Sequence, residues 1–414
     1  MQEDFYPAAE KILSDIEATF KKDPRLKSFE ILPVPTNQNK SPVYHVEHCL
    51  GLESWCVPHV YCHAYQNVMS LRQNKNKAKD YSRLNTLLMG ALIINPAIHT
   101  FWNMRRDLIN TRKLDPYFEL HFTSVILTRK PKTPDIFSHR KWILNKILQD
   151  STEDTPVLVN EMHICELAAD RYSNNYHAWT HRLWCLSKGI QINHISFYHQ
   201  ELVWSRAWVM QHVSDYSGIQ YRQQLLTKIM ASATENVFTY DDLIVLHDEN
   251  EDVINNFVKL WHIIDLNMHV QTIPLTLKLS ILELSFNNEL IRNFPGHEAL
   301  WYHRRFVFNM FKNIIFQKDT YDTNKYWGYI DAANHFNADG VPLEKNQKVD
   351  ISRNNEKFAM ILSIHEEIFL RKFADELCDS REKINANRHK QWLSKFMKFQ
   401  LPYNLDLLKN DVKM

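Results

Sequence analysis

One pattern recurs along this chain and limits what it can fold into: a large apolar residue followed three positions later by arginine. The five arginines of the pattern are Arg105, Arg140, Arg182, Arg222 and Arg304. Their separations are 35, 42, 40 and 82 residues, and the last is about twice the others. A period of roughly 35 to 42 residues is typical of repeats that each consist of two helices.

The residues around each arginine indicate how these repeats pack. Trp179 and Arg182 are three positions apart and therefore share one helix face. Further aromatic residues follow five positions after the first, at Trp142, Trp184 and Phe306. Such a helix is apolar on two sides and packs between neighbours. The pattern predicts an all-α fold, an α–α superhelix in the form of a right-handed solenoid, whose arginines bond a carboxylate or a helix carbonyl.

Composition agrees with helices and excludes several function classes. Glycine is scarce, with 7 in 414 residues, which disfavours a fold rich in turns and strands. The net charge of +1 provides no basic field for nucleic acid. The N-terminus lacks the features of a signal peptide, and no apolar stretch is long enough for a transmembrane helix. Six cysteines without framework spacing indicate reduced thiols in a cytosolic protein.

The pattern divides the chain into four expected parts. We expect an N-terminal helical segment at 1–80 that is continuous with the repeats, which occupy 81–312. A polar stretch at 313–356 breaks the periodicity and reads as a loop insert. Residues 357–414 are expected to form a C-terminal helical repeat or cap, with Lys390 where the arginine would stand.

A histidine- and cysteine-rich stretch lies at residues 45–63. Its members are His45, His48, Cys49, Cys56, His59, Cys62 and His63. These residue types suit zinc, but their spacing matches no pattern that would justify a metal site. We therefore assign no metal to this chain, and leave open whether this stretch ever binds one.

The stretch NYHAWTHRLW at 175–184, together with the NP and PK turns before other repeats, resembles the repeats of the protein prenyltransferase α-subunit family. The segments LGLESWCV, HVSDYSG and FPGHEALWYHRR extend the resemblance over most of the chain, toward a geranylgeranyltransferase branch of that family. The resemblance implies that the helix pairs form a crescent around a catalytic β subunit.

The resemblance assigns roles residue by residue. Lys132 takes the place of the family's lysine that reaches the prenyl diphosphate, and Tyr176 and His177 match its active-site Tyr and His. These three are the candidate catalytic residues, and Lys132, Tyr176 and Asp135 are the candidate substrate-binding residues. Asp135 falls where the family has a Gln that contacts the carboxylate of a C-terminal CaaX peptide. Because an anion repels a carboxylate, Asp135 puts ordinary CaaX recognition in doubt.

The resemblance implies an enzyme that is active only with a partner. This chain would be the α subunit of a heterodimeric protein geranylgeranyltransferase, with a β subunit of the Rab geranylgeranyltransferase type and geranylgeranyl diphosphate as the prenyl donor. It would bind no cofactor itself, with zinc expected in the β subunit. Acceptors would be trafficking proteins such as a Golgi SNARE or Rab GTPases, and the location cytoplasmic, with peripheral association at the Golgi. The alternatives are a non-catalytic helical-repeat adaptor, and a farnesyltransferase or Rab geranylgeranyltransferase α subunit.

Overall fold

The computed structural model describes residues 8–73, 80–150, 155–192, 194–234, 275–316, 351–376 and 380–397. The chain divides into two compact units, Met1–His194 and Ile195–Met414. Helices dominate both units in the part of the chain that is described. The expected insert at 313–356 is helical at its two ends, and its residues 317–350 lie outside the described residues, as do residues 235–274.

The first unit combines helices with three short strands. In chain order its elements are α1 (Ala9–Lys22), β1 (Ser28–Leu32), β2 (Val43–Val46), β3 (Cys49–Glu53), the 3-10 turn η1 (Ser54–Cys56), α2 (Val57–Gln73), α3 (Tyr81–Ile94), α4 (His99–Asn110), α5 (Pro116–Arg129), α6 (Pro134–Asp150), α7 (Thr155–Arg171) and α8 (Tyr176–Ile192). The second unit contains α9 (His194–Gln211), α10 (Tyr216–Thr234), α12 (Leu275–Asn293), α13 (Glu298–Phe316), α15 (Ile351–Glu376), α16 (Ser380–Trp392) and the π-helical turn η5 (Leu393–Met397).

The helices form pairs of the kind that the repeat pattern predicts. The pairs are α3/α4, α5/α6 and α7/α8 in the first unit, and α9/α10, α12/α13 and α15/α16 in the second. Every arginine of the pattern lies on the second helix of its pair and is buried. The all-α prediction, with an α–α superhelical class of fold, is confirmed. The division between the units falls inside the expected repeat range 81–312.

Within each unit, a buried ion-pair network links successive helix pairs. Arg105 on α4 donates from Nε and Nη2 to the two carboxylate oxygens of Glu119 on α5, at 2.7 and 2.5 Å. His139 on α6 donates from Nε2 to the same carboxylate at 2.8 Å. Although burial favours the protonated acid, the charge and hydrogen bonds of Arg105 and the hydrogen bond of His139 lower the pKa of Glu119 to about 2. One glutamate therefore joins two successive pairs.

The same network recurs in both units. In the first unit Arg140 and His181 share Glu161, and in the second unit Arg222 and His303 share Glu283. Arg304 and Glu366 form the last bidentate pair, with His389 Nε2 at 3.0 Å from the carboxylate. The pairing of fully buried charges with good geometry avoids the cost of an isolated buried ion.

Each arginine also bonds the first helix of its own pair. Arg140 Nη1 donates to the Leu120 carbonyl at 2.5 Å and to Thr123 Oγ1 at 2.6 Å. Arg222 Nη1 does the same with the Leu202 carbonyl at 2.9 Å. The prediction that these arginines bond a carboxylate or a helix carbonyl is thus confirmed, since each of these two bonds both. An arginine in this position ties three helices together.

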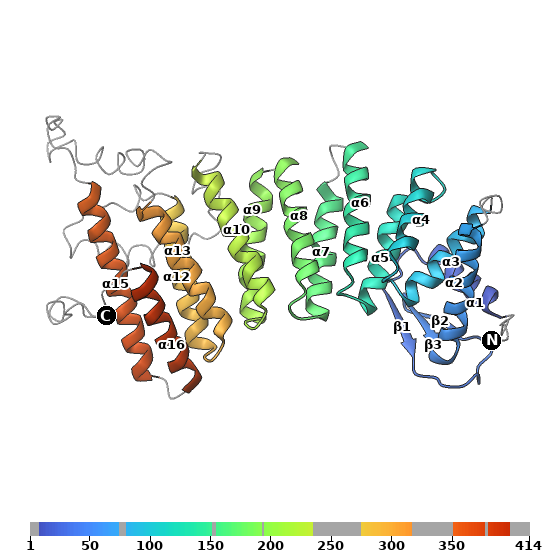
Figure 1. Cartoon of the computed structure of the whole chain (residues 1–414), viewed down its shortest axis with the longest axis horizontal. Coiled ribbons are helices and arrows are strands. Elements are labelled where there is room, and N and C mark those ends of the chain that lie inside the picture. The colour runs from blue at the N-terminus through green and yellow to red at the C-terminus, as the bar shows by residue number, and fades with distance from the viewer. Residues whose placement is uncertain are drawn as a thin grey trace. The chain divides into compact units, whose positions relative to one another are not determined.

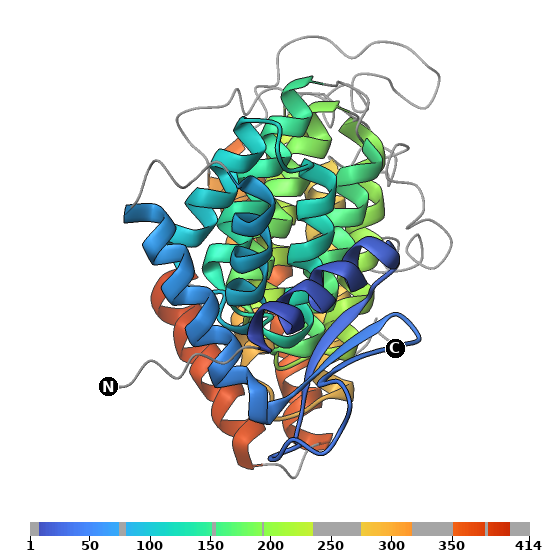
Figure 2. The same ribbon diagram turned by 90° about the vertical axis from the view of Figure 1, so that its right-hand side faces the viewer.

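Residues 28–53 differ from the helical segment expected for 1–80. They form a three-stranded sheet of order β1-β3-β2, with β1 parallel to β3 and β2 antiparallel to it. Figure 2 faces this end of the first unit and shows the strands next to α1, which contacts β2. The side chains of Phe29, Leu50 and Leu52 are fully buried. Apolar runs of five residues are too short for periodicity to distinguish strand from helix, so the helical expectation failed here.

Side-chain bonds hold this sheet in place. The carboxylate of Asp23, just after α1, lies 2.7 Å from His45 Nε2 and 2.8 Å from His48 Nδ1. The hairpin between β2 and β3 turns through Glu47 and His48, whose φ values of 47° and 67° lie in the left-handed region. In the segment LGLESWCV, the buried Glu53 carboxylate accepts bonds from Tyr44 and Trp55.

Candidate functional site

Lys132 lies in the short turn that joins α5 and α6 and is exposed. Its Nζ stands 4.4 Å above the ring centroid of Tyr172, which follows α7. Two prolines, Pro131 and Pro134, fix the backbone of this turn, and Pro134 begins α6. No carboxylate lies within ion-pair distance of Lys132 among the residues that the structure describes. The ammonium is therefore held at the surface by an aromatic face, without a counter-charge among the described side chains.

The buried side chain of Asn175 connects the Lys132 turn to the start of α8. Its amide donates to the Pro131 carbonyl at 2.7 Å and to the Ala168 carbonyl at 3.0 Å. Its oxygen accepts from the Ala178 amide at 3.3 Å, as an N-cap residue does. Sequence reasoning did not single out Asn175 as a positioning residue. Its place just before a helix, as an Asn, is the signal that could have found it.

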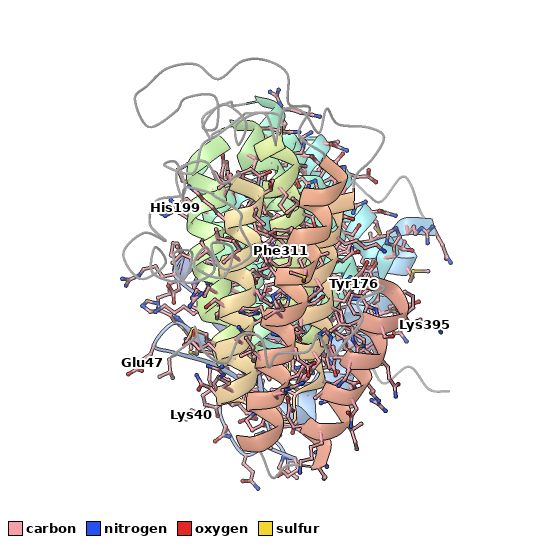
Figure 3. All side chains as sticks on the ribbon, turned by 90° about the vertical axis from the view of Figure 1, so that its left-hand side faces the viewer. Lys40, Glu47, Tyr176, His199, Phe311 and Lys395 are labelled. Atoms are coloured by element: carbon pink, nitrogen blue, oxygen red, sulfur yellow. The ribbon has the colours of Figure 1, made fainter. Side chains whose placement is uncertain are left out.

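Tyr176 and His177 occupy the first turn of α8, beside Lys132. Tyr176 is 59% exposed and is labelled in Figure 3, while His177 is partly buried. The two ring centroids lie 5.6 Å apart in an edge-to-face arrangement. Burial and the nearby Lys132 charge both lower the pKa of His177. The structure thus brings His177 close enough to Lys132 to be affected by its charge and places the Tyr176 ring against His177, so an imidazole that favours its neutral form lies near an ammonium.

Asp135 lies in the first turn of α6 and faces the neighbouring helix α4. Its Oδ1 is 3.1 Å from Nδ1 of His99, the first residue of α4. No ion pair joins Asp135 to Lys132 among the described residues. Among the described residues Asp135 is therefore paired with His99 rather than with Lys132, although all of these residues lie at or just before the start of the second helices of the repeats. The His99 contact was not anticipated, because residues 36 positions apart leave no local signal.

The histidine- and cysteine-rich stretch 45–63 is distributed over separate contacts. His45 and His48 bond Asp23, and His63 Nε2 lies 3.3 Å from Glu10. Burial raises the pKa of the Cys56 thiol to about 11, and its Sγ lies 3.1 Å from the Glu53 carbonyl. Within the described ranges, no three His, Cys, Asp or Glu side chains are grouped so that they could hold a metal ion.

Among the described helices, none is both long enough and apolar enough to cross a bilayer.

Known proteins resemble this chain over most of its length. It is 33% identical over 317 residues to protein prenyltransferase alpha subunit repeat-containing protein 1 of Danio rerio, covering 72% of this chain and 71% of the relative. It is 30% identical over 329 residues to protein prenyltransferase alpha subunit repeat-containing protein 1-B of Xenopus laevis, covering 75% and 74%. The chain belongs to the family of protein prenyltransferase alpha subunit repeat-containing protein 1.

A family model and a more distant relative also match parts of this chain. The family model for the protein prenyltransferase alpha subunit repeat matches residues 158–189 and 282–311. The first match includes Asn175, Tyr176 and His177, whereas Lys132 lies outside both. The geranylgeranyl transferase type-2 subunit alpha of Saccharomyces cerevisiae is 24% identical over 169 residues, which is 40% of this chain and 50% of that protein. The two matches fall on the helix pairs α7/α8 and α12/α13, which are therefore prenyltransferase α-subunit repeats.

Proposed function

We propose that this chain is the α subunit of a heterodimeric protein geranylgeranyltransferase. The subunit would transfer nothing alone and would supply half of an active site. The observation that carries the proposal is the ammonium of Lys132, which lies over Tyr172 with no ion-pair partner among the described residues and lowers the pKa of His177, a residue of the matched repeat 158–189. That arrangement offers one cation and two hydrogen-bonding groups to an anionic ligand, which suits a diphosphate.

The reaction proposed is the alkylation of a cysteine thiolate. The sulfur forms a bond to C1 of the geranylgeranyl group while the C1–O bond breaks and diphosphate leaves with both bonding electrons. Negative charge therefore grows on the departing oxygen, and a fixed cation beside it stabilises the transition state more than the bound substrate. Lys132 would hold this position, and its flexible stem allows it to follow the departing group.

Tyr176 and His177 would position the same diphosphate. The exposed Tyr176 hydroxyl can donate a hydrogen bond to a phosphate oxygen. Because burial and Lys132 lower the pKa of His177, its imidazole is neutral near pH 7 and can donate from one ring nitrogen. Neither group would exchange a proton with the substrate in this scheme.

The partner would provide the rest of the site. We expect a β subunit of the Rab geranylgeranyltransferase type, with a zinc ion that lowers the pKa of the acceptor thiol. The acceptors would be trafficking proteins of the Golgi SNARE or Rab type, and the enzyme would act in the cytoplasm, with peripheral association at the Golgi. Support for this choice is the resemblance of the chain to the geranylgeranyl transferase type-2 subunit alpha of yeast.

Co-expression with candidate β subunits tests the proposal. A stable 1:1 complex that geranylgeranylates a protein acceptor is expected, and Lys132→Ala should lower its turnover by about 100-fold with the complex intact. Lys130→Ala, two residues earlier and also exposed, is the matched control and should leave turnover near the wild-type level.

Each other outcome points to an alternative. Failure to form a complex with any β subunit would favour the adaptor function, in which the repeats only bind proteins. A complex that prefers farnesyl diphosphate would favour a farnesyltransferase α subunit. Full activity of the Lys132→Ala enzyme would remove the role assigned to that lysine while leaving the heterodimer in place.

A further inference from the structure

His99, Asp135 and His177 lie in the first turns of the second helices α4, α6 and α8. Each is followed, seven residues later, by a residue on the same helix face. Seven residues correspond to nearly two turns, so His99 and Arg106 on α4, for example, lie on one face about 10 Å apart along the axis. The same spacing relates Asp135 to Trp142 on α6, and His177 to Trp184 on α8. The face that holds the candidate site at its end therefore continues along all three helices.

This continuation carries cations stacked on indole rings. The Arg106 guanidinium lies 5.5 Å from the Trp142 ring centroid, and Lys146 Nζ lies 5.9 Å from the same centroid. On the next pair, Lys141 Nζ lies 5.3 Å from the Trp184 centroid. We call these five residues the cation–indole ladder. The ladder spans α4, α6 and α8, which pack side by side in the order of the repeats (Figure 1).

The inner sides of the two indoles rest on the buried ion-pair network. His139 is stacked on Trp142 with an interplanar angle of 8° and a centroid distance of 6.2 Å. His181 is stacked on Trp184 at 5.6 Å and 22°. Because these histidines are fixed by their glutamates, the indoles are fixed too. Rigid, half-buried Trp and Arg side chains are the residue types that most often anchor protein interfaces.

The outer side of the ladder carries three cations, Arg106, Lys141 and Lys146. No carboxylate lies within ion-pair distance of Arg106, Lys141 or Lys146 in the described part of the chain. Arg106 bonds His139 Nδ1, and Lys146 bonds Asn110 Oδ1, so their hydrogen-bond partners are neutral. Partial burial lowers the pKa of Arg106, with Asp135 acting in the opposite direction. A carboxylate brought to this face would meet the partly buried Arg106 and Lys146 and the exposed Lys141.

We propose that the cation–indole ladder is a docking surface for an acidic face of the protein that completes the active site. This inference rests on the proposed function, and adds where the partner binds and by what chemistry. A folded protein surface fits better than a nucleic acid or a membrane. The three cations are interrupted by indoles, Asp135 stands at one end of the same face, and the whole chain has a net charge of only +1.

The test is charge reversal in the co-expressed heterodimer with a Rab-type β subunit. Lys141→Glu with Lys146→Glu should weaken the complex at least about tenfold, mainly through faster dissociation at low salt. The matched control makes the same charge change on α1, where Lys11→Glu with Lys22→Glu should change affinity less than about twofold. Both lysines on α1 are exposed and lie outside the ladder. Thermal unfolding checks whether the charge-reversed chain is folded. If it is not, the milder double variant Lys141→Gln with Lys146→Gln replaces it and should also weaken the complex.

The outcomes separate the two proposals. A weaker complex for the ladder variants, together with an affinity of the wild type that falls with salt, supports the docking surface. If both ladder variants bind the β subunit as tightly as the α1 control does, the docking surface is overturned and the proposed function is left intact. If the wild-type chain binds no β subunit at all, both proposals fall.

Discussion

Arg140 on α6 and Glu161 on α7 form a bidentate ion pair from which water is excluded, with Nε–Oε1 and Nη2–Oε2 distances of 2.7 and 2.5 Å. The same carboxylate accepts a bond from His181 on α8 at 2.7 Å. The pair thus joins the second helix of one repeat to both helices of the next. Such a contact contributes to register between repeats as well as to stability.

Removal of the Glu161 carboxylate should be strongly destabilising. Glu161→Ala leaves the Arg140 guanidinium buried and without a counter-charge, which costs about 3–5 kcal/mol of unfolding free energy. Urea unfolding of the full chain, followed by circular dichroism, measures this loss. Glu166→Ala on the same helix is the control, because Glu166 is partly exposed, and should change the free energy by less than about 0.5 kcal/mol. Equal effects of the two substitutions would contradict the importance of the network.

Acid should destabilise the chain through the same carboxylates. Burial favours protonated Glu161, but the Arg140 charge and the bonds from His181 and Arg140 lower its pKa from 4.5 to about 2. Because the folded-state pKa is below the unfolded one, this stabilisation is complete above pH 4.5 and is lost as the pH falls toward 2. Unfolding free energies measured from pH 7 down to pH 3 should therefore fall less steeply for Glu161→Gln than for the wild type. Parallel curves would show that Glu161 does not contribute to the acid response.

The repeat architecture was predictable because it leaves a periodic trace in the sequence. The aromatic–x–x–Arg pattern located the second helix of each pair, and helix geometry placed Trp179 and Arg182 on one buried face. The carboxylate partners were predicted only as a class. They too leave a trace, since Glu119 and His139, like Glu161 and His181, are twenty residues apart. A search for an acid 21 residues before the arginine would have found Glu119 before Arg140, Glu161 before Arg182 and Glu283 before Arg304.

The sheet and the site geometry could not be predicted in the same way. Strands of four or five residues carry too little periodicity, so β1 to β3 were missed. Lys132 stacks over the ring of Tyr172, which belongs to the next repeat. Contacts between residues of different repeats leave no local motif in the sequence. The resemblance supplied Lys132, Tyr176 and His177 as candidates, but not Asn175, whose amide bridges the two turns. Whether the three candidates act in catalysis stays a prediction.

Asn175 should affect the proposed active site through position rather than contact. Asn175→Ala removes the N-cap acceptor of α8 and leaves the Pro131 and Ala168 carbonyls without their donor, at a cost of about 1–3 kcal/mol. The Lys132 turn then loses its tie to Tyr176 and His177. In the heterodimer, KM for geranylgeranyl diphosphate should rise.

A second substitution separates positioning from stability. Asn175→Ser keeps an oxygen at the N-cap but is too short to replace the amide at both carbonyls, so part of the stability should return while KM stays high. Thr180→Ala, on an exposed position of α8, is the control for both measurements. If KM followed the unfolding free energy across the three variants, Asn175 would be structural only.

Asp135 should decide which acceptors the heterodimer rejects. Its carboxylate lies in the first turn of α6 and bonds His99, and under the proposed function it repels the terminal carboxylate of a simple CaaX peptide. Asp135→Gln, which supplies an amide of the type that contacts such a carboxylate, should raise kcat/KM for CaaX peptides by about tenfold, as one charge-assisted contact allows. Asp135→Asn removes the charge without extending the side chain and should give a smaller gain. Peptide geranylgeranylation assays on the three enzymes measure this order. A wild-type enzyme that modifies CaaX peptides as fast as protein acceptors would rule out the repulsion by Asp135.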